Sequence, residues 1–344
     1  MADLLQFTDE GIYCATADVY IDPWRPVKRA LITHGHADHA RWGHQHYLCT
    51  EAAKPVIQYR LRTEAPIETV AFGETRTING VQFSFHPAGH LIGSAQIRVE
   101  HQGEVWVVSG DYKVVPDGLA EPFEPIACHA FITESTFGLP IYRWQAQEAT
   151  FAAINNWWRQ NATHGITTIL AGYSLGKAQR ILHGVDTSIG PILTHGAVEN
   201  INKVLRAQGI PLPATERVTQ ETPKENWQGG LVIAPPSALA SAWIKKFAPY
   251  SLGVASGWMA LRGARRRRAV DRGFVLSDHA DWNELNEAIA ATRAERVIVT
   301  HGYTNLFAQW LQSQGYDAIT ADTQYEGELG EMGEGTDNNE EEDA

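Results

Sequence analysis

The segment LITHGHADH at residues 31–39 constrains this chain more than any other stretch. His34, His36, Asp38 and His39 fall within six positions, directly after a short apolar run that predicts a buried strand. A strand that runs into a tight loop can direct His34 and His36 toward one ion, and Asp38 and His39 toward a second. Imidazole and carboxylate groups suit zinc or a similar borderline metal. The spacing therefore favours a metal site over a histidine-rich surface loop.

Three later segments supply the ligands that a two-metal site still requires. His90 lies in a turn after the alternating segment 81–87, and Asp111 ends the apolar run 105–108. His301 follows the apolar run 297–299. In this interpretation His90 completes the first ion's set, Asp111 bridges both ions, and His301 serves the second ion.

Three further residues stand at strand ends near this set. Asp22 comes shortly before residues 33–39, which carry the first four predicted ligands and are called the metal loop below. Asp22 either fixes a liganding imidazole or starts the turn at Pro23. Glu134 ends the strand expected at 130–134, and His279 follows the strand expected at 273–277. We predict catalytic roles for Asp38, Glu134 and His279, the last as a general acid or phosphate clamp that Glu134 orients.

Two basic features are candidate phosphate contacts. Residues 262–268 hold five arginines, of which four are consecutive: Arg265, Arg266, Arg267 and Arg268. Lys177 lies in YSLGKAQR (173–180), where a strand is expected to turn into a helix; the alternative is a plain strand-to-helix turn. These side chains would make sequence-independent contacts with a nucleic-acid backbone.

The net charge of −12 is concentrated at one end of the chain. Residues 321–344 contain ten acidic side chains and neither lysine nor arginine, which leaves the remainder with 30 acidic and 28 basic residues. The segment's low hydrophobicity predicts a disordered tail that is dispensable for catalysis, so that truncation after Thr320 should be tolerated. The overall acidity is thus no argument against a polyanionic substrate.

The remaining sequence predicts a cytoplasmic protein with mixed helices and strands. No apolar stretch approaches the roughly 20 residues that a membrane span needs, and no signal pattern opens the chain. The three cysteines are far apart and indicate neither a disulfide framework nor a thiolate metal site. Helices are expected over 40–62, 144–160 and 282–293, and His44 and His46 are interpreted as ordinary polar residues.

The ordered motifs resemble those of the metallo-β-lactamase superfamily. His34-x-His36-x-Asp38-His39, His90 and Asp111 match the shared pattern, while Glu134, His279 and His301 match motifs of its β-CASP nuclease branch. Within the branch, the chain is most similar to bacterial exonucleases that are associated with ATP-dependent DNA ligases and a helicase in DNA repair.

The resemblance implies an αββα sandwich with an inserted β-CASP domain. We expect the core at residues 1–139 and 273–320, the insert at 140–272 and the acidic tail at 321–344. It also implies two Zn²⁺ ions, with Mn²⁺ as the alternative, and a substrate between core and insert.

The predicted activity is phosphodiester hydrolysis on DNA, with RNA as the alternative because His301 is usual in RNA-processing relatives. A small-molecule metallohydrolase is disfavoured by the insert and by the late histidine motifs. A non-catalytic nucleic-acid-binding scaffold should have lost ligands, whereas here the full set is present.

Overall fold

The computed structural model describes residues 3–62, 64–261, 263 and 270–325, which form two compact units. Unit 1 contains the described residues up to 143 and from 278 onward, and unit 2 contains residues 144–277. The joins lie a few residues later than the expected 139/140 and 272/273. Tyr142 stays with unit 1 because its carbonyl accepts from the Trp282 N–H, and Val275 stays with unit 2 because its carbonyl accepts from Thr150.

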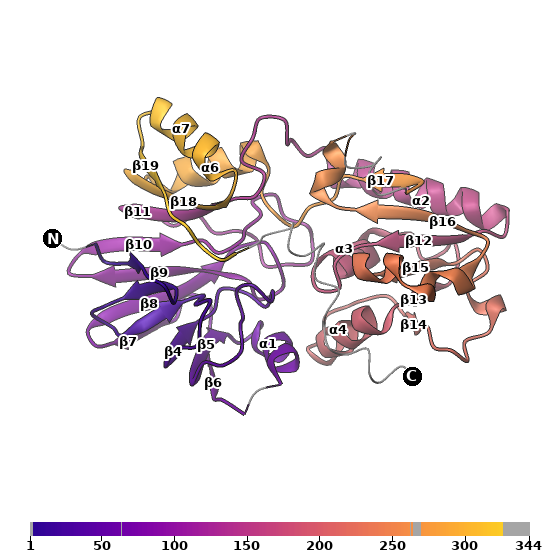
Figure 1. The fold of residues 1–344 in the computed structure, drawn as a ribbon, viewed down its shortest axis with the longest axis horizontal. Helices are drawn as coiled ribbons and strands as arrows, with labels where there is room; N and C mark the ends of the chain where they lie inside the picture. Colours follow the sequence, from indigo (N-terminus) through magenta and orange to yellow (C-terminus); the bar gives the residue numbers. More distant parts are fainter. Residues whose placement is uncertain (1–2, 63, 262, 264–269, 326–344) are drawn as a thin grey trace. The chain divides into compact units, whose positions relative to one another are not determined.

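Unit 1 contains a six-stranded sheet in which the strands are neighbours in chain order. Its strands β4, β5 and β6 lie side by side in Figure 1. Strands β1, β2 and β3 pair with their neighbours in antiparallel orientation. From β3 to β6, each strand pairs in parallel with the next. The strands are β1 (Gln6–Phe7), β2 (Ile12–Cys14), β3 (Val19–Ile21), β4 (Arg29–Leu31), β5 (His46–Thr50) and β6 (Ile67–Val70).

The second sheet of unit 1 has seven strands, in the order β19-β18-β11-β10-β9-β8-β7. Strands β7 to β10 form an antiparallel meander, while β10, β11, β18 and β19 run parallel. The bounds are β7 (Thr75–Ile78), β8 (Val81–Pro87), β9 (Ala95–His101), β10 (Glu104–Val108), β11 (Ala130–Ser135), β18 (Arg296–Gly302) and β19 (Asp317–Thr320).

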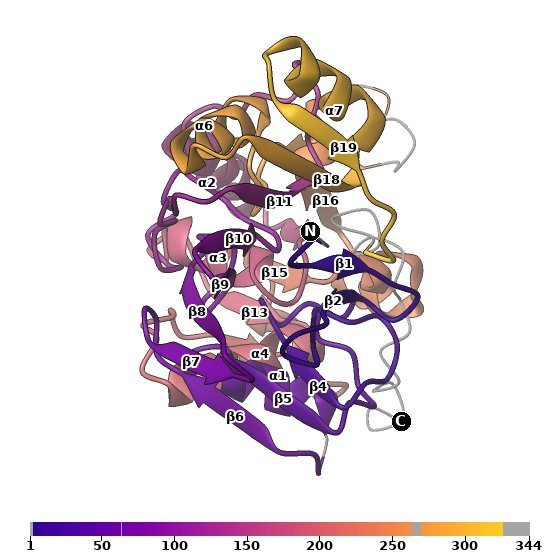
Figure 2. The same cartoon turned by 90° about the vertical axis from the view of Figure 1, so that its left-hand side faces the viewer.

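The apolar side chains of unit 1 fall into three layers. One buried cluster joins the two sheets, with Ile21 and Leu31 from the first and Phe85 and Val108 from the second. A second cluster packs the outer face of the seven-stranded sheet against α6 (Trp282–Thr292) and α7 (Thr304–Ser313), which lie beside β18 and β19 in Figure 2. A third packs α1 (Lys54–Leu61) on the outer face of the six-stranded sheet. Each sheet therefore buries both faces.

Unit 2 is built on a six-stranded, wholly parallel sheet in the order β14-β13-β15-β12-β16-β17. The strands are β12 (Thr167–Ala171), β13 (Ile192–Thr194), β14 (Glu216–Arg217), β15 (Leu231–Ala234), β16 (Tyr250–Ala255) and β17 (Arg272–Phe274). Among the described residues of unit 2, the helices with given bounds are α2 (Gln147–Thr163), α3 (Lys177–Gly184) and α4 (Gly196–Ala207), with the 3₁₀ turns η1 (Lys224–Asn226), η2 (Pro236–Ala240), η3 (Ala242–Phe247) and η4 (Gly257–Ala260). One face packs on α2 and α3 and the other on Trp227 and Phe247, as parallel sheets require.

The helix expected over residues 40–62 is wrong for most of its length. Residues 46–50 form β5, which pairs with β4 and β6, and only α1 is helical. The strand is five residues long, and a short apolar run of this kind does not distinguish strand from helix by periodicity. Burial of Tyr47 and Cys49 against α1 decides the outcome.

His44 precedes β5 and is buried. Its Nδ1 accepts a hydrogen bond from the Val27 N–H at 3.2 Å, which requires the neutral ring. Burial, with a smaller contribution from the Arg41 charge, lowers the pKa of His44 to about 4.

This arrangement predicts a pH-dependent loss of stability. Between pH 6.5 and 4 the unfolded chain binds a proton at His44 that the folded chain excludes, so stability falls as the pH falls and is unaffected above pH 6.5. The slope of the unfolding free energy against pH measures how many more protons the unfolded chain binds than the folded chain. His44→Gln should lower that number by up to about one. Urea unfolding at pH 7 and pH 5 measures this, with the exposed His46→Gln as control. Equal slopes in all three proteins would contradict the prediction.

Candidate metal centre

The predicted ligands converge at the strand ends of unit 1. The loop after β4 carries His34, His36, Asp38 and His39, and the turn after β8 carries His90. Asp111 follows β10, and His301 lies near the end of β18. Because β10, β11 and β18 are parallel, their carboxyl ends meet at one edge of the sheet.

Close backbone approaches make this convergence feasible. Gly110 has a φ of +58°, and a Cβ there would lie 2.7 Å from Thr33 Oγ1 in the metal loop. Gly302 has a φ of +97°, and its Cβ would lie 2.3 Å from the Ser135 carbonyl oxygen. Only glycine fits both the positive φ and the space, so these residues set the positions of Asp111 and His301 beside them.

The first metal cluster consists of His34, His36, His90 and Asp111, whose ligand atoms all lie within 4.8 Å of one another. His90 Nε2 lies 3.1 Å from His36 Nδ1 and 3.8 Å from Asp111 Oδ2. His34 Nε2 lies 3.5 Å from the same carboxylate oxygen. All four residues are buried, which is the compact arrangement that one metal ion requires.

The second metal cluster consists of His39, His301 and the same Asp111, and Asp38, predicted as a further ligand, lies beside His39. The other oxygen of Asp111, Oδ1, lies 3.0 Å from His301 Nε2 and 3.6 Å from His39 Nε2. Asp38 Oδ2 lies 3.8 Å from His39 Nε2. Asp111 therefore presents one oxygen to each cluster, which is the arrangement of a bridging ligand.

Hydrogen bonds behind the ligands fix which nitrogen each ring presents. Asp22 Oδ2 accepts from His39 Nδ1 at 2.8 Å and from the Thr33 hydroxyl at 2.5 Å. Thr33 Oγ1 lies 3.0 Å from His34 Nδ1 and can accept its proton. Both imidazoles thus keep Nδ1 protonated and leave Nε2 for a metal ion. The Asp278 carbonyl accepts from His90 Nδ1 in the same way, at 2.9 Å.

The donor set fits a divalent metal ion. His34 Nε2 and His39 Nε2 are buried and have no hydrogen-bond partner within the described part of the chain. Burial lowers the pKa of His34 and of His90, which keeps both rings neutral, as metal binding requires. Burial would also lower the pKa of His39, but Asp111, Asp38 and Asp22 outweigh it and raise this pKa to about 10. The second cluster thus favours a positive charge, which a bound cation would supply.

Glu134 and His279 lie next to the first cluster. His279 Nδ1 lies 2.9 Å from Glu134 Oε2 and 4.0 Å from Asp111 Oδ2. Glu134 Oε1 also accepts from the Tyr112 N–H at 2.8 Å, which holds the carboxylate in place. Glu134, His279 and Asp111 form a third group whose spacing could hold an ion. With Nδ1 directed at Glu134, the opposite edge of the His279 ring is the one that can act on a substrate.

Two groups of predicted phosphate contacts are not among the residues of these clusters. Arg265, Arg266, Arg267 and Arg268 lie outside the described residues. Lys177 begins α3 in unit 2, where its exposed fraction is 1%. The role of Lys177 as a phosphate contact stays a prediction.

Three contributors to the site were not singled out in the sequence. Thr33 connects Asp22 to His34, and the Asp278 carbonyl holds His90. Tyr325 is buried against His39, although it lies within the segment expected to be a disordered tail. Residues 321–325 therefore belong to the folded unit, while 326–344 lie outside the described residues. The sequence contains one indication that these residues belong to the folded unit, namely a single aromatic residue in an otherwise acidic segment.

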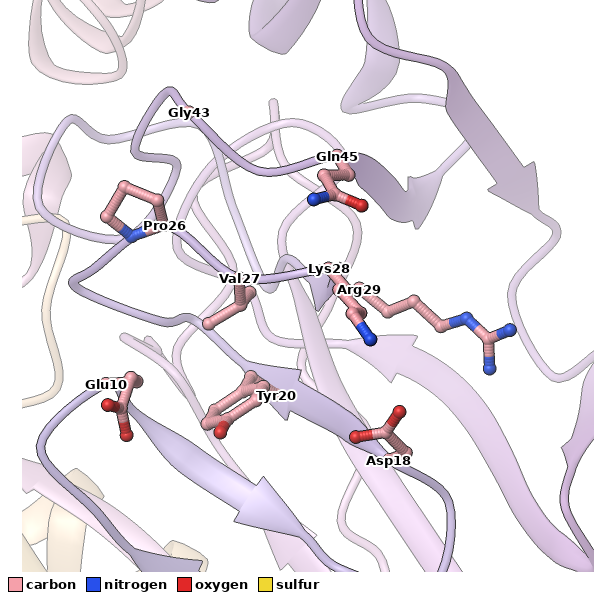
Figure 3. A pocket seen from close by; sticks show the side chains of 9 residues that line it. All are labelled: Glu10, Asp18, Tyr20, Pro26, Val27, Lys28, Arg29, Gly43 and Gln45. Carbon is pink, nitrogen blue, oxygen red and sulfur yellow. The ribbon is translucent and has the colours of Figure 1, made fainter.

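A separate pocket in unit 1 has a volume of about 360 Å³ (Figure 3). Its lining combines acidic and basic side chains, including Glu10, Asp18, Lys28 and Arg29. None of the described residues that line it is a predicted metal ligand. The histidine and aspartate clusters are therefore the candidate functional site.

Among the described residues, no helix combines the length and apolar character needed to cross a bilayer.

Comparison with known proteins gives relatives and a similar fold, although no family model matches the chain. A probable DNA ligase of Opitutus terrae is 30% identical over 92% of this chain and 31% of its own length. Cleavage and polyadenylation specificity factor 73 of Drosophila melanogaster is 28% identical over 46% of this chain and 25% of its own. Endoribonuclease YSH1 of Saccharomyces cerevisiae is 30% identical over 34% and 15%, respectively.

The chain thus spans about a third or less of the length of these relatives. A crystal structure of a protein of unknown function from Enterococcus faecalis shares the fold, with a TM-score of 0.59 and 9% identity over 87% of this chain and 80% of that one. Together with the ordered metal motifs, the similarity to the three named relatives shows that the chain belongs to the metallo-β-lactamase superfamily, in its β-CASP nuclease branch.

Proposed function

We propose that this chain is a two-metal phosphodiester hydrolase with an αββα core and a β-CASP insert, and that it acts on DNA as an exonuclease. The observation that carries the proposal is Asp111, which presents one oxygen to each of two histidine clusters. Zinc is the proposed metal because the ligands are imidazoles and carboxylates, with Mn²⁺ as the alternative.

The residues divide the chemical work between them. When bound, two metal ions supply positive charge for the phosphate and make a water molecule more acidic. Asp22 and Thr33 hold His39 and His34 in the orientation that presents Nε2. Glu134 holds His279 through Nδ1, so that the ring can donate a proton from its other edge to the departing oxygen.

The choice of DNA is supported by the relative named as a probable DNA ligase, which matches 92% of this chain. In that protein the matching region makes up 31% of the length, consistent with a nuclease that works alongside a ligase in repair. A helicase partner is part of the same proposal through the resemblance alone.

RNA is the second candidate. Several relatives are named as endoribonucleases, and His301, usual in RNA-processing members, is present in the second cluster. These relatives match only about a third of the chain, which is why DNA is preferred.

The deciding experiment uses end-labelled DNA and RNA of the same sequence, single-stranded and duplex, with metal content measured on the same sample. We expect about two ions per chain and release of mononucleotides from DNA. Preferential cleavage of RNA would establish the second candidate. Full metal content without hydrolysis of either polymer would contradict the proposed nuclease function.

A further inference from the structure

The final described segment of the chain, residues 321–325, runs along the second metal cluster. Its backbone joins β18 where the Ala321 N–H donates to the Val299 carbonyl at 3.0 Å. Arg41 links it to the metal loop, because one guanidinium donates to the Gln324 carbonyl at 2.9 Å and to the Asp38 carbonyl at 3.2 Å. The segment is thereby attached to the strand of one ligand and the loop of two others.

Tyr325 makes the closest contact with the ligands. Its ring stacks on His39, with centroids 4.2 Å apart and planes 12° from parallel. It meets His301 edge-on at 5.6 Å, and Trp24 packs edge-on against it at the same distance. Only 9% of Tyr325 is exposed. The phenol ring therefore covers one face of His39 and abuts a second ligand of the same cluster.

The hydroxyl of Tyr325 reaches the residue that orients His39. It donates to the Asp22 carbonyl at 2.9 Å, while the Asp22 carboxylate accepts from His39 Nδ1. Asp22 has a φ of +42°, a left-handed backbone conformation that needs support from its surroundings. Tyr325 thus restrains His39 twice, directly through its face and indirectly through Asp22.

From these contacts we propose that Tyr325 is a positioning residue for the second metal cluster, and that it sets the affinity for the second ion. The inference rests on the proposed two-metal function. Residues behind metal ligands typically change metal affinity by about 10–100-fold when they are replaced. Tyr325 contacts His39 and His301 of the second cluster directly, whereas it reaches His34 of the first cluster only through Asp22 and Thr33, so the larger effect is expected on the second ion.

The test is a metal titration of full-length variants in competition with a chromophoric zinc chelator. Tyr325→Ala should weaken the binding of the second Zn²⁺ by about 10–100-fold and that of the first by much less. Tyr325→Phe keeps the stacked ring and should stay within a few-fold of wild type. Tyr13→Ala is the matched control, since it removes a ring stacked on Tyr20 at 4.4 Å in the same unit.

Three results would overturn the proposal. Wild-type affinity for both ions in Tyr325→Ala is one, and equal weakening of both ions with a lower melting temperature of the metal-free protein is another. If Tyr325→Ala does not fold, Tyr325→Leu replaces it, because leucine fills the volume without a planar face. The third overturning result is wild-type affinity for both ions in Tyr325→Leu. Because no result depends on hydrolysis, failure of the nuclease assay would leave this inference standing.

Two truncations extend the test to the acidic end of the chain. Removing residues 326–344 leaves Tyr325 in place and should preserve both affinities. Removing residues 321–344 deletes Tyr325 and should weaken the second ion as Tyr325→Ala does, contrary to the expectation that everything after Thr320 is dispensable. Identical titration curves for the two truncated proteins would contradict this.

Discussion

Replacement of Asp111 by asparagine should remove both metal ions and lower the rate of phosphodiester hydrolysis by about 10⁴-fold or more. A loss of this size is possible because enzymatic rate enhancements are typically at least about 10⁶-fold. Each carboxylate oxygen faces a different cluster, at 3.5 Å from His34 and 3.0 Å from His301. The histidines around it keep the pKa of Asp111 well below its usual range despite burial, so the carboxylate is charged at neutral pH. The amide has the same shape but lacks that charge.

Elemental analysis and single-turnover kinetics on the same preparation measure the effect. His34→Ala should lose the first ion preferentially, which separates a ligand of one cluster from the shared one. Asp317→Asn, on the surface of β19, is the control and should retain metal and activity. An Asp111→Asn protein with two tightly held ions would exclude the bridging role.

Replacement of His279 by alanine should lower the rate by about 10²–10⁴-fold while the protein retains both ions, the usual effect of losing a positioned general acid. In this interpretation, the bond from Nδ1 to Glu134 at 2.9 Å orients the ring. The competing interpretation is structural, because His279 is fully buried and packs near His90 at 4.7 Å between ring centroids. It predicts a lower melting temperature with little change in rate per folded molecule.

Metal content, melting temperature and single-turnover rate distinguish the two. His86→Ala is a matched control, since His86 also pairs with a glutamate, Glu124, at 3.2 Å, but outside the metal clusters. Glu134→Gln should produce a smaller loss than His279→Ala, because the amide oxygen can still accept from Nδ1. Loss of an ion from His279→Ala would reassign it as a ligand in the third group with Asp111 and Glu134.

The sequence was most informative where a ligand follows an apolar strand. His90, Asp111 and His301 each stand in such a position, and parallel pairing of β10, β11 and β18 brings strand ends together whatever their separation along the chain. Other features depend on tertiary contacts that no local pattern encodes. Residues 46–50 become a strand because two neighbours pair with them, and Tyr325 is ordered because His39 and Asp22 hold it.

The parallel pairing of β11 with β18 has a consequence during synthesis. Strand β11 ends at Ser135, but its partner begins only at Arg296, after the whole of unit 2 has been translated. At about 5–20 residues per second, the ribosome leaves the hydrogen-bonding edge of β11 open for on the order of ten seconds. An open, apolar strand edge invites pairing with other nascent chains. Early folding of unit 2, whose parallel strands are contiguous in the chain, would shorten the search for β18 and limit that exposure.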